Sequence, residues 1–489
     1  MIVRDVEAAS RREFDLVIVG GGIHGVALLH EAARRGVPAC LCEARDFGGA
    51  TSWNSLRILH GGLRYLQTLN LVRFFDSVAA RRRLALMFPR LVRPLTCLMP
   101  LYGTSLRRTS VLRMALFAND VLSPHRNSGL PESMHLPRGT IEGPSRVRRE
   151  FPLVRGEGLT GGACWTDYLM ISSERILIEL LRDACRHGAV ALNYAPVDDV
   201  VQEGGVARAV RVRDSLSGAT HVIAARAIVN CAGADLPKVA KSLGGDAQGL
   251  FRPSLAFNVL LDLAPLSDCA LAVAGPQAAA QIMFLVPMRD SLLAGTMHVP
   301  RPEGALDAAP TQAEVAQFVG MLNAAVPRLG ARVDRVRRVF SGLLPATAVG
   351  STDLEGRDRI FDHGRSGGLQ RAYSVSGVKF TTATSVAKRA LRMTCEPYVD
   401  PPGPVADIEL SSSTPLLIDS RRLCFDDEGS LHSALKKVVD EESVHSMDDL
   451  VLRRTNWATT DADLGQLRER LAALIDLPSM TTGFQDANA

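Results

Sequence analysis

Near the start of the chain, the spacing of apolar residues changes from that of a strand to that of a helix and back. A largely apolar, β-branched run from Phe14 to Val19 predicts a buried strand, and the apolar spacing that follows it predicts a helix. A second apolar run from Val37 to Cys42 predicts the next strand. Because strand, helix and strand follow closely, this pattern favours a parallel, doubly wound α/β sheet with helices on its faces.

Further along the chain, helix and strand patterns continue. Helical apolar spacing covers residues 69–87, 105–122, 173–187 and 311–325. Strand patterns cover residues 189–194, 255–263, 281–288 and 291–299. Alternating segments at 200–214 and 221–235 predict an antiparallel hairpin followed by a return strand. After the helix predicted at 69–87, Pro89, Pro94 and Pro100 predict a break in regular structure.

The character of the chain changes near residue 400. A proline-rich stretch from Pro397 to Pro404 predicts a joint between domains. Helical patterns follow the joint at residues 430–441, 447–454 and 461–475. Since 489 residues are too many for one simple core, we expect two or three domains, the last of them helical.

Composition and charge narrow the class of protein. The chain is 46% hydrophobic and carries a net charge of only +4, which gives no case for nucleic acid as a partner. Basic clusters such as residues 81–83 favour a solvated face over a site for an anionic substrate or lipid. The N-terminus is too polar for a signal peptide, and no stretch reaches 18 apolar residues free of charge. These features predict a cytoplasmic protein without a transmembrane helix.

The cysteines point to neither a metal site nor disulfides. There are nine of them, and no CxxC pair or Cys/His ligand spacing is present. Reduced thiols are therefore expected, and no metal is required.

The turn after the first strand carries the spacing GxGxxG, with Gly20, Gly22 and Gly25. The first glycine allows a tight turn, the second lets backbone approach a pyrophosphate, and the third lets the helix pack on the strand. The helix N-terminus directs N–H groups at that pyrophosphate. Glu43 ends the second strand, where a carboxylate can accept from a ribose hydroxyl. Together these parts predict a dinucleotide site and leave its identity, NAD or FAD, open.

The segment from Gly48 to Gln67, GGATSWNSLRILHGGLRYLQ, is more specific. Together with the opening motif it resembles the FAD-dependent glycerol-3-phosphate dehydrogenases, which belong to the D-amino-acid oxidase-like flavoprotein superfamily. Three later segments are similar in the same order: 281–299 with VPM and GTMHV, 376–382 (SGVKFTT), and 448–455 (DDLVLRRT). The resemblance covers nearly the whole chain.

The resemblance implies a discontinuous architecture and noncovalent FAD. A doubly wound FAD-binding domain, a Rossmann fold of the glutathione-reductase type, is expected from residues 14–100, 155–245 and 337–398. An antiparallel-sheet substrate domain is expected from residues 101–154 and 246–336, and a helical domain from residues 399–489.

The same resemblance implies a reaction. In this family a hydride leaves a secondary alcohol carbon for flavin N5, the hydroxyl proton goes to a base, and the electrons pass to a quinone or to oxygen. Lys379 is the candidate for the positive charge that stabilises the reduced flavin. Arg64 and Tyr65 match the family's substrate-contacting pair. For His60, the roles of base, flavin contact and packed core residue remain open.

The resemblance also carries over cofactor and substrate contacts. The expected cofactor contacts are Gly20, Gly22, Ile23, His24, Gly25, Glu43, Ala50, Thr51, Ser52, Ser55, His60, Gly62, Val197, Gly233, Gly342, Gly377, Lys379, Phe380 and Thr381. Arg357 falls where the family carries a phosphate-binding arginine, and a surface ion pair explains it equally well.

Two departures from the family pattern affect the substrate site. Leu344 stands where the family has an arginine, and residues 252–255 replace an element that supplies a candidate base. His298 is a candidate for the missing base, and Arg289 for the missing charge. The flavin site is therefore expected to be intact and the substrate site altered.

The prediction from sequence is an FAD-dependent oxidoreductase that oxidises a small secondary alcohol, with sn-glycerol 3-phosphate as the leading substrate and dihydroxyacetone phosphate as the product. One alternative keeps the flavin and changes the substrate to another polyol phosphate, a hydroxy acid or an amine. Another is a flavoprotein that only binds. A homo-oligomer is expected, and peripheral contact with the cytoplasmic face of the inner membrane is left open.

Overall fold

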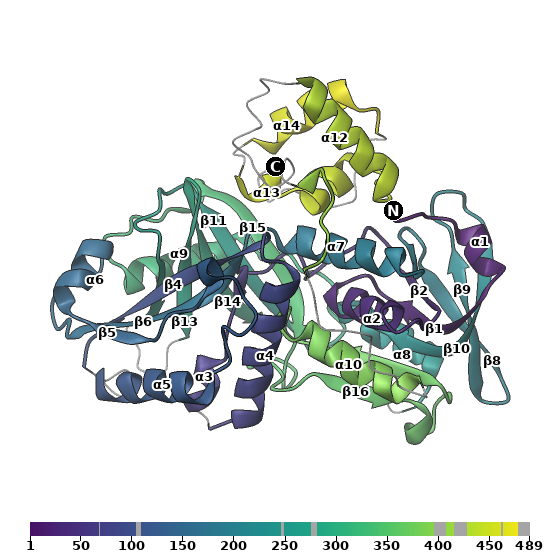
Figure 1. Ribbon diagram of the computed structural model, residues 1–489, viewed down its shortest axis with the longest axis horizontal. Helices are drawn as coiled ribbons and strands as arrows, with labels where there is room; N and C mark the ends of the chain where they lie inside the picture. Colours follow the sequence, from purple (N-terminus) through teal and green to yellow (C-terminus); the bar gives the residue numbers. More distant parts are fainter. Residues whose placement is uncertain are drawn as a thin grey trace.

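The structure is a computed structural model built on two large sheets, which lie at opposite ends of the long axis (Figure 1). It describes residues 1–67, 69–103, 109–245, 249–274, 281–395, 407–414, 428–460 and 463–477. Within those residues, none of the helices has the length and apolar character that crossing a membrane requires.

The first sheet contains the predicted strand–helix–strand unit. Its main path runs in the order β16-β17-β10-β1-β2-β7, and β8 and β9 extend it from β10. Strands β17, β10, β1, β2 and β7 run parallel, as expected for a doubly wound sheet. The bounds are β1 (Glu13–Val19), β2 (Ala39–Cys42), β7 (Val190–Leu192), β8 (Val197–Glu203), β9 (Val206–Arg213), β10 (Thr220–Asn230), β16 (Arg359–Asp362) and β17 (Ala372–Ser376).

Helices cover both faces of this sheet. The central helix of one face, α2, packs against α7 and α10, and the three share one apolar core. The helices near this sheet are α1 (Val6–Ser10), α2 (Ile23–Ala33), α7 (Ser173–Arg186), α8 (Leu236–Leu243) and α10 (Ala383–Thr394).

The second sheet is antiparallel except where β12 meets β4. Its order is β15-β11-β14-β13-β12-β4-β6-β3, with β5 paired to β6. The bounds are β3 (Ile58–Leu59), β4 (Val92–Leu101), β5 (Thr140–Glu142), β6 (Gly161–Met170), β11 (Pro253–Leu261), β12 (Ala270–Ala274), β13 (Ile282–Met288), β14 (Ser291–Pro300) and β15 (Val336–Pro345).

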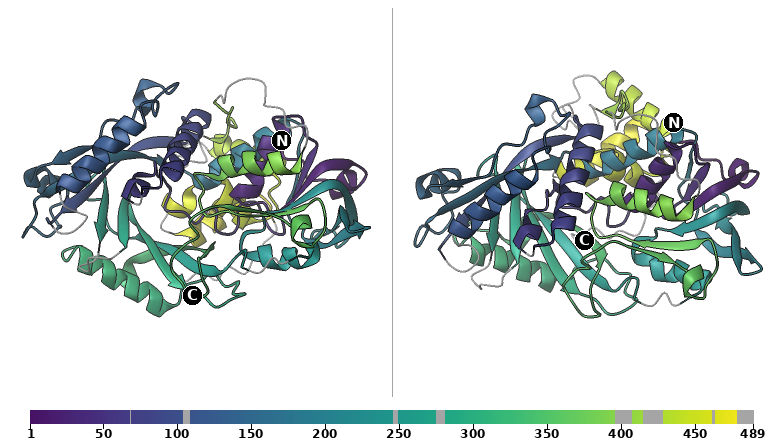
Figure 2. Two further views of the ribbon diagram at one scale, coloured as in Figure 1. Left: turned by 90° about the horizontal axis from the view of Figure 1, so that it is seen from below. Right: turned by 60° about the horizontal axis from the view of Figure 1, so that its bottom comes forward.

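Two apolar cores flank the second sheet. One includes side chains of α6 and α9, and the other includes side chains of the C-terminal helices, among them the buried Trp457. The views in Figure 2 keep this sheet and the first at opposite ends. The helices around it are α3 (Leu63–Gln67), α4 (Leu71–Met87), α5 (Thr109–Leu122), α6 (Pro144–Glu150), α9 (Gln312–Ala325), α12 (Glu428–Glu441), α13 (Trp457–Thr460) and α14 (Leu464–Leu474).

The prediction that the three prolines break regular structure is wrong for two of them. Pro94 and Pro100 both lie inside β4. A proline lacks an N–H, so a strand tolerates it where the neighbouring strand needs no bond from it. On the β12 side, β4 pairs only at Cys97 and Leu98, so both prolines lie beyond that ladder.

The two sheets divide the chain differently from the predicted domain boundaries. Strands β3 and β6, and all but one residue each of β4 and β15, lie inside the ranges expected for the FAD-binding domain, yet all four belong to the second sheet. No hydrophobic period distinguishes a strand of one sheet from a strand of the other, because sheet membership depends on long-range pairing. The domain ranges themselves stay a prediction.

The C-terminal helices are fixed to the first sheet by buried ion pairs. Arg454 donates to both carboxylate oxygens of Asp46, at 2.7 and 2.8 Å, and Arg453 donates to one of them at 2.7 Å. Arg175 of α7 donates to Glu442 at 2.7 and 2.8 Å. Since Asp46 lies three residues after Glu43, the predicted 448–455 motif is tied to the loop that leaves β2. The predicted proline joint at 397–404 lies outside the described residues.

Candidate functional site

The glycine turn after β1 has the geometry that a pyrophosphate loop needs. Gly20 has φ +107°, and a Cβ there would lie 2.7 Å from the carbonyl oxygen of Cys231. A Cβ on Gly25 would lie 1.9 Å from the carbonyl oxygen of Gly20. The turn and the first turn of α2 therefore pack too closely for any side chain at these two positions.

The loop at residues 50–55 lies across the N-terminus of α2. Ser52 Oγ accepts a hydrogen bond from the backbone N–H of Ile23 at 2.9 Å. Thr51 Oγ1 donates to the carbonyl of Leu343 at 3.0 Å, and a Cβ on Gly342 would meet Thr51 at 2.6 Å. This loop thus joins the glycine turn to β15 of the second sheet, so the expected phosphate contacts lie at the junction of the two sheets.

Glu43 lies at the end of β2, facing the glycine turn. Its two carboxylate oxygens accept backbone N–H groups from Gly21 and Arg45, at 2.6 and 2.8 Å. Desolvation of the carboxylate raises its pKa, while these two hydrogen bonds and the charge of Arg45 oppose that rise. Each carboxylate oxygen has a second acceptor position, so the arrangement leaves acceptors for a ribose hydroxyl.

The turn after β17 packs directly on α2. A Cβ on Gly377 would lie 2.0 Å from Nε2 of His24, so only glycine fits beside this ring. Asp358 holds the turn by accepting the N–H of Val378 at 3.1 Å and the hydroxyl of Thr382 at 3.5 Å. Burial lowers the pKa of His24. Among the residues that the structure describes, its buried Nδ1 has no hydrogen-bond partner, which suits a polar group of a bound cofactor.

Lys379 and Tyr65 meet in the structure although 314 positions separate them in the chain. Lys379 Nζ donates to the hydroxyl of Tyr65 and lies 4.3 Å from the centroid of its ring. Gly62 packs against the same ring, since a Cβ there would lie 3.3 Å from Tyr65 Cδ2. Arg64 lies beside Tyr65 in α3, and its side chain is outside the described part of the structure.

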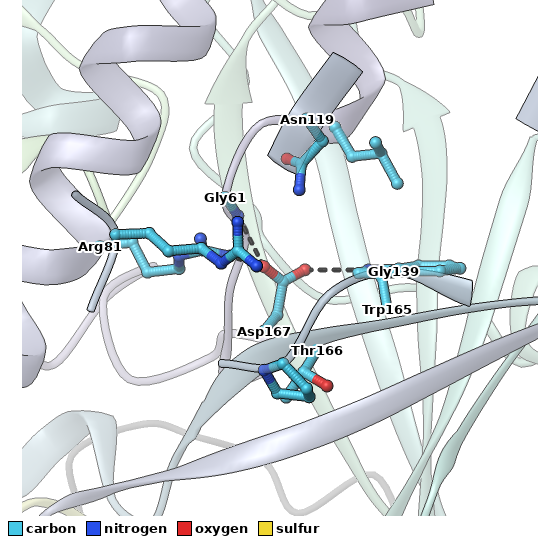
Figure 3. A pocket seen from close by; sticks show the side chains of 10 residues that line it. Gly61, Arg81, Asn119, Gly139, Trp165, Thr166 and Asp167 are labelled. Carbon is cyan, nitrogen blue, oxygen red and sulfur yellow. Dashed lines mark hydrogen bonds and ion pairs between the residues drawn. The ribbon is translucent and has the colours of Figure 1, made fainter. Parts of the chain in front are cut away.

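His60 is oriented by a buried carboxylate. Its side chain is 44% exposed, and Nδ1 lies 3.5 Å from Oδ2 of Asp167. Asp167 also accepts the N–H of Gly61 at 2.8 Å and bonds from Arg81 and Trp165 (Figure 3). Burial favours the neutral acid, but the hydrogen bond from His60 and the charge of Arg81 outweigh burial and lower the pKa of Asp167 to about 2. Asp167 is therefore a fixed anion under His60.

His298 lies on β14 and faces the same side of the sheet as Gly342. Both residues pair with Ala256 of β11, one from each neighbouring strand. Directly paired residues point to one face of a sheet, and the missing Cβ of Gly342 points at Thr51. His298 therefore faces the side on which the 50–55 loop lies. Leu344 is two positions further along β15, on this same face.

Other predicted residues lie on different parts of the surface. Arg289 is exposed in the turn between β13 and β14, five residues from Phe284, whose ring contacts His60. At about 3.3 Å per residue in a strand, the backbone of Arg289 lies about 16 Å along the chain from that of Phe284. The substrate role of Arg289 stays a prediction. Arg357 is exposed and adjoins Gly356, where a Cβ would lie 3.4 Å from a terminal nitrogen of Arg73.

The remaining expected cofactor contacts fall around the glycine turn and the Lys379 turn. Gly233 follows β10, whose end contacts Gly20, and Val197 begins β8 two residues after Ala195, which donates to the carbonyl of Glu43 at 2.8 Å. Ser55 accepts the N–H of Arg57 at 3.2 Å. Ala50 lies beside Thr51, and Phe380 and Thr381 follow Lys379. Their cofactor roles stay predictions.

Two positioning residues escaped the sequence analysis. Asp358 holds the turn of Lys379, and Asp167 holds His60. Neither lies in a glycine-rich motif, and each acts on a residue far away in the chain. Asp358 follows Arg357, a predicted substrate contact, so its position next to that residue could have identified it as a candidate. Asp167 lies next to no predicted site residue.

Comparisons with known proteins show which family the chain resembles. The sequence model of the FAD dependent oxidoreductase family matches residues 15–393. A glycerol-3-phosphate dehydrogenase of Synechocystis sp. is 28% identical over 402 residues, which cover 79% of this chain and 70% of that protein. An alpha-glycerophosphate oxidase of Lactococcus lactis is 26% identical over 350 residues, which cover 71% of this chain and 57% of that protein.

Solved structures share the fold. The glycerol-3-phosphate dehydrogenase from Bacillus halodurans complexed with FAD superposes with a TM-score of 0.71 at 20% identity, covering 96% of this chain and 90% of that one. The L-proline dehydrogenase from P. horikoshii has a TM-score of 0.58 at 15% identity, covering 80% and 96%. The chain spans less than two thirds of the Lactococcus protein.

Proposed function

Because this chain belongs to the FAD dependent oxidoreductase family, we propose that it oxidises sn-glycerol 3-phosphate to dihydroxyacetone phosphate. The observation that carries the proposal is the pair of Tyr65 and Lys379. These side chains come from opposite ends of the family match and meet beside a glycine turn built for a dinucleotide. The names of the curated relatives, glycerol-3-phosphate dehydrogenases and alpha-glycerophosphate oxidases, support this choice of substrate.

The residues present fit FAD. Gly20 and Gly25 leave no room for side chains at the pyrophosphate turn, and Glu43 has acceptor positions free for a ribose. The ring of His24 packs on Gly377 of the Lys379 turn, and its buried Nδ1 has no partner among the described residues. FAD, when bound, supplies the hydride acceptor for the alcohol carbon.

Lys379 places a positive charge at the reacting end of the site, where negative charge develops during the reaction. Its turn is held by Asp358 and packs on α2, so the ammonium group is positioned before substrate arrives. Tyr65 accepts a hydrogen bond from Lys379 and presents its ring to the same space. Arg64, its neighbour in α3, is the expected substrate contact.

His60 is the first candidate for the base that takes the hydroxyl proton. Its ring is accessible, and the buried carboxylate of Asp167 stabilises the imidazolium that forms when the proton arrives. His298 is the second candidate, on the sheet face that borders the 50–55 loop. The Asp167 contact favours His60 over His298 as the base. Of the three roles that the sequence leaves open for His60, that of a packed core residue is the least consistent with its exposed fraction of 44%.

The electron acceptor that we propose is a quinone or oxygen, since the relatives' names include both dehydrogenases and oxidases. Peripheral contact with a membrane is supported by exposed apolar side chains on α4 and α5, both of which pack on α3. They include Val72 (72% exposed), Met114 (72%) and Phe117 (69%). Sedimentation of the protein with anionic vesicles tests this contact. A homo-oligomer remains part of the proposal.

An anaerobic titration with sn-glycerol 3-phosphate, followed through the visible flavin absorption, tests the proposed reaction. Rapid bleaching supports both FAD and the substrate. A yellow protein that does not bleach contradicts the substrate and retains the cofactor. A colourless protein that binds no added FAD contradicts both.

A second candidate substrate class keeps the flavin chemistry and changes the alcohol. Leu344 favours it, because a leucine cannot bind the phosphate group that the resembling family meets with an arginine. Polyol phosphates, hydroxy acids and amines belong in the same titration as alternative reductants.

A further inference from the structure

Arg73 lies at the edge of the Tyr65–Lys379 cluster, and the proposed chemistry does not yet use it. It belongs to the first turn of α4, where Asn70 caps the helix by accepting the backbone N–H of Arg73 at 3.2 Å. The backbone N–H of Asn70 in turn donates to the carbonyl of Tyr65 at 2.9 Å. Consequently α4 begins directly beside Tyr65, and the side chain of Arg73 reaches back to that ring.

Two cations approach the ring of Tyr65. The guanidinium carbon of Arg73 lies 5.1 Å from the ring centroid, and Lys379 Nζ lies 4.3 Å from it. Each contact is an ordinary cation–π distance. Two positive charges held around one ring repel each other, so the arrangement gains stability when an anion lies between or beside them.

The segment that carries Arg357 leaves space for the guanidinium. A Cβ on Gly356 would lie 3.4 Å from one terminal nitrogen of Arg73 and 3.7 Å from the other. The missing side chain at Gly356 therefore lets Arg73 lie against the backbone next to Arg357. Through this contact, α4 and the segment before β16 bring two arginines to the edge of the cluster.

These cations have no carboxylate counter-ion in the described part of the chain. Neither Arg73, Arg357 nor Lys379 forms an ion pair with a described acidic residue. Asp358, which follows Arg357 in sequence, is engaged by the N–H of Val378, the hydroxyl of Thr382 and, at 3.7 Å, Arg389. Arg73 and Lys379 are both partly buried, where a charge without a counter-ion is costly, so this pair of cations points to an anionic ligand.

We propose that Arg73 is a further contact for the phosphate group of the substrate, a dianion, beside Arg357, for which the family resemblance already implies that role; this rests on the proposed function. Arg73 then supplies the charge that is missing at Leu344 on β15. A guanidinium suits this role because its planar fork can donate two parallel hydrogen bonds to phosphate oxygens. The location also separates the two tasks of the site: phosphate recognition at the edge near α4, and hydride and proton removal at Lys379 and His60.

The test compares Arg73→Gln, Arg73→Lys and a control, Arg82→Gln, in the flavin-loaded protein. Arg82 lies on the same helix and its Nε donates to the carbonyl of Ser128, away from Tyr65. Equal flavin content in all variants establishes that they fold. In anaerobic reduction by sn-glycerol 3-phosphate, Arg73→Gln should raise the half-saturating concentration by about 10- to 100-fold, the usual worth of a charge-assisted hydrogen bond, with little change in the limiting rate.

The other two variants sharpen the result. Arg73→Lys keeps the charge without the fork, so its half-saturating concentration should fall between those of wild type and Arg73→Gln. Arg82→Gln should match wild type. An Arg73→Gln protein that saturates at the wild-type concentration overturns the inference.

Inorganic phosphate gives a readout that does not need turnover. It should raise the melting temperature of the wild-type protein and of Arg82→Gln, and should have a smaller effect on Arg73→Gln. If sn-glycerol 3-phosphate fails to reduce the wild-type flavin while this difference persists, the proposed function is wrong and the anion contact of Arg73 stands. If the flavin is reduced and phosphate stabilises wild type and Arg73→Gln equally, the contact is wrong and the proposed function stands.

Discussion

The two ends of the candidate site are built in different ways. At the cofactor end, the expected contacts come mainly from short stretches around β1, β2 and α2, and backbone groups do much of the positioning: Glu43 accepts two N–H groups, and Ser52 accepts a third. At the substrate end, side chains from remote segments meet, as Lys379 does with Tyr65. A local turn fixes the first end, whereas the packing of the whole molecule fixes the second.

This difference suggests how each end tolerates change. A backbone turn without room for a Cβ fails as a unit when one glycine is replaced. A side-chain cluster can instead lose one member and keep the rest, so a cation missing from β15 can be supplied by α4. Variants that separate cofactor binding from turnover therefore test the comparison directly.

The largest effect is expected for Gly25→Ala. The added methyl would lie 1.9 Å from the carbonyl oxygen of Gly20, so the turn must open and the purified protein should contain little or no flavin. Gly320→Ala in α9 is the matched control, because a Cβ there meets nothing within 4 Å. The ratio of visible to ultraviolet absorbance measures flavin content. A fully yellow Gly25→Ala protein would contradict the role given to this turn.

Next in size is Lys379→Ala, which should leave flavin content intact and slow turnover. Removing a preorganised charge at a reacting centre costs about 10²- to 10³-fold in rate. Rapid-mixing reduction by sn-glycerol 3-phosphate measures this loss without interference from the acceptor. If Lys379→Ala is reduced as fast as wild type, the mechanism proposed for Lys379 is wrong.

The same contrast explains how much the sequence could predict. The GxGxxG turn, its flanking strands and Glu43 were predictable because their spacing reflects local backbone geometry. The resemblance added Tyr65 and Lys379, which the structure brings together. Asp167 and Arg73 were not predictable, since each matters only through a neighbour that the fold supplies from elsewhere.

The second sheet shows the same limit for the fold. The strands predicted at 281–288 and 291–299 correspond to β13 and β14, because alternation and a short turn mark a hairpin locally. The strand β4 was missed, since its prolines suggest a break and only its partners reveal that they are tolerated. The helix predicted at 69–87 corresponds to α4, which begins at Leu71, after Leu69 at φ +53°.

A smaller effect on catalysis is expected for Asp167→Asn, with a pH signature in stability. The pKa of Asp167 falls from 3.8 to about 2 on folding, so its stabilisation is complete above pH 4 and is lost as the pH drops towards 2. That difference corresponds to about 2 kcal/mol of unfolding free energy. The variant should therefore unfold more easily at pH 7 and show a flatter decline between pH 4 and pH 2.

Turnover of Asp167→Asn should fall by about tenfold, because His60 loses the anion that orients it. This loss is smaller than the loss expected when a general base is removed altogether. Denaturant unfolding at several pH values and flavin reduction at neutral pH measure the two effects separately. Equal reduction rates in Asp167→Asn and wild type would show that the Asp167 contact serves only the fold.

The smallest effect is expected for His298→Ala. If His60 takes the proton, removing His298 changes the packing beside Ala256 and should slow flavin reduction by less than about threefold, far below the loss that accompanies removal of a general base. His60→Ala should lose about 10²-fold or more in the same assay. If His298→Ala instead loses more activity than His60→Ala, His298 of β14 is the base. The second sheet would then contribute a catalytic residue as well as residues that border the site. The pair of variants thus decides whether proton removal belongs to the loop that leads into Tyr65 or to the sheet that faces it.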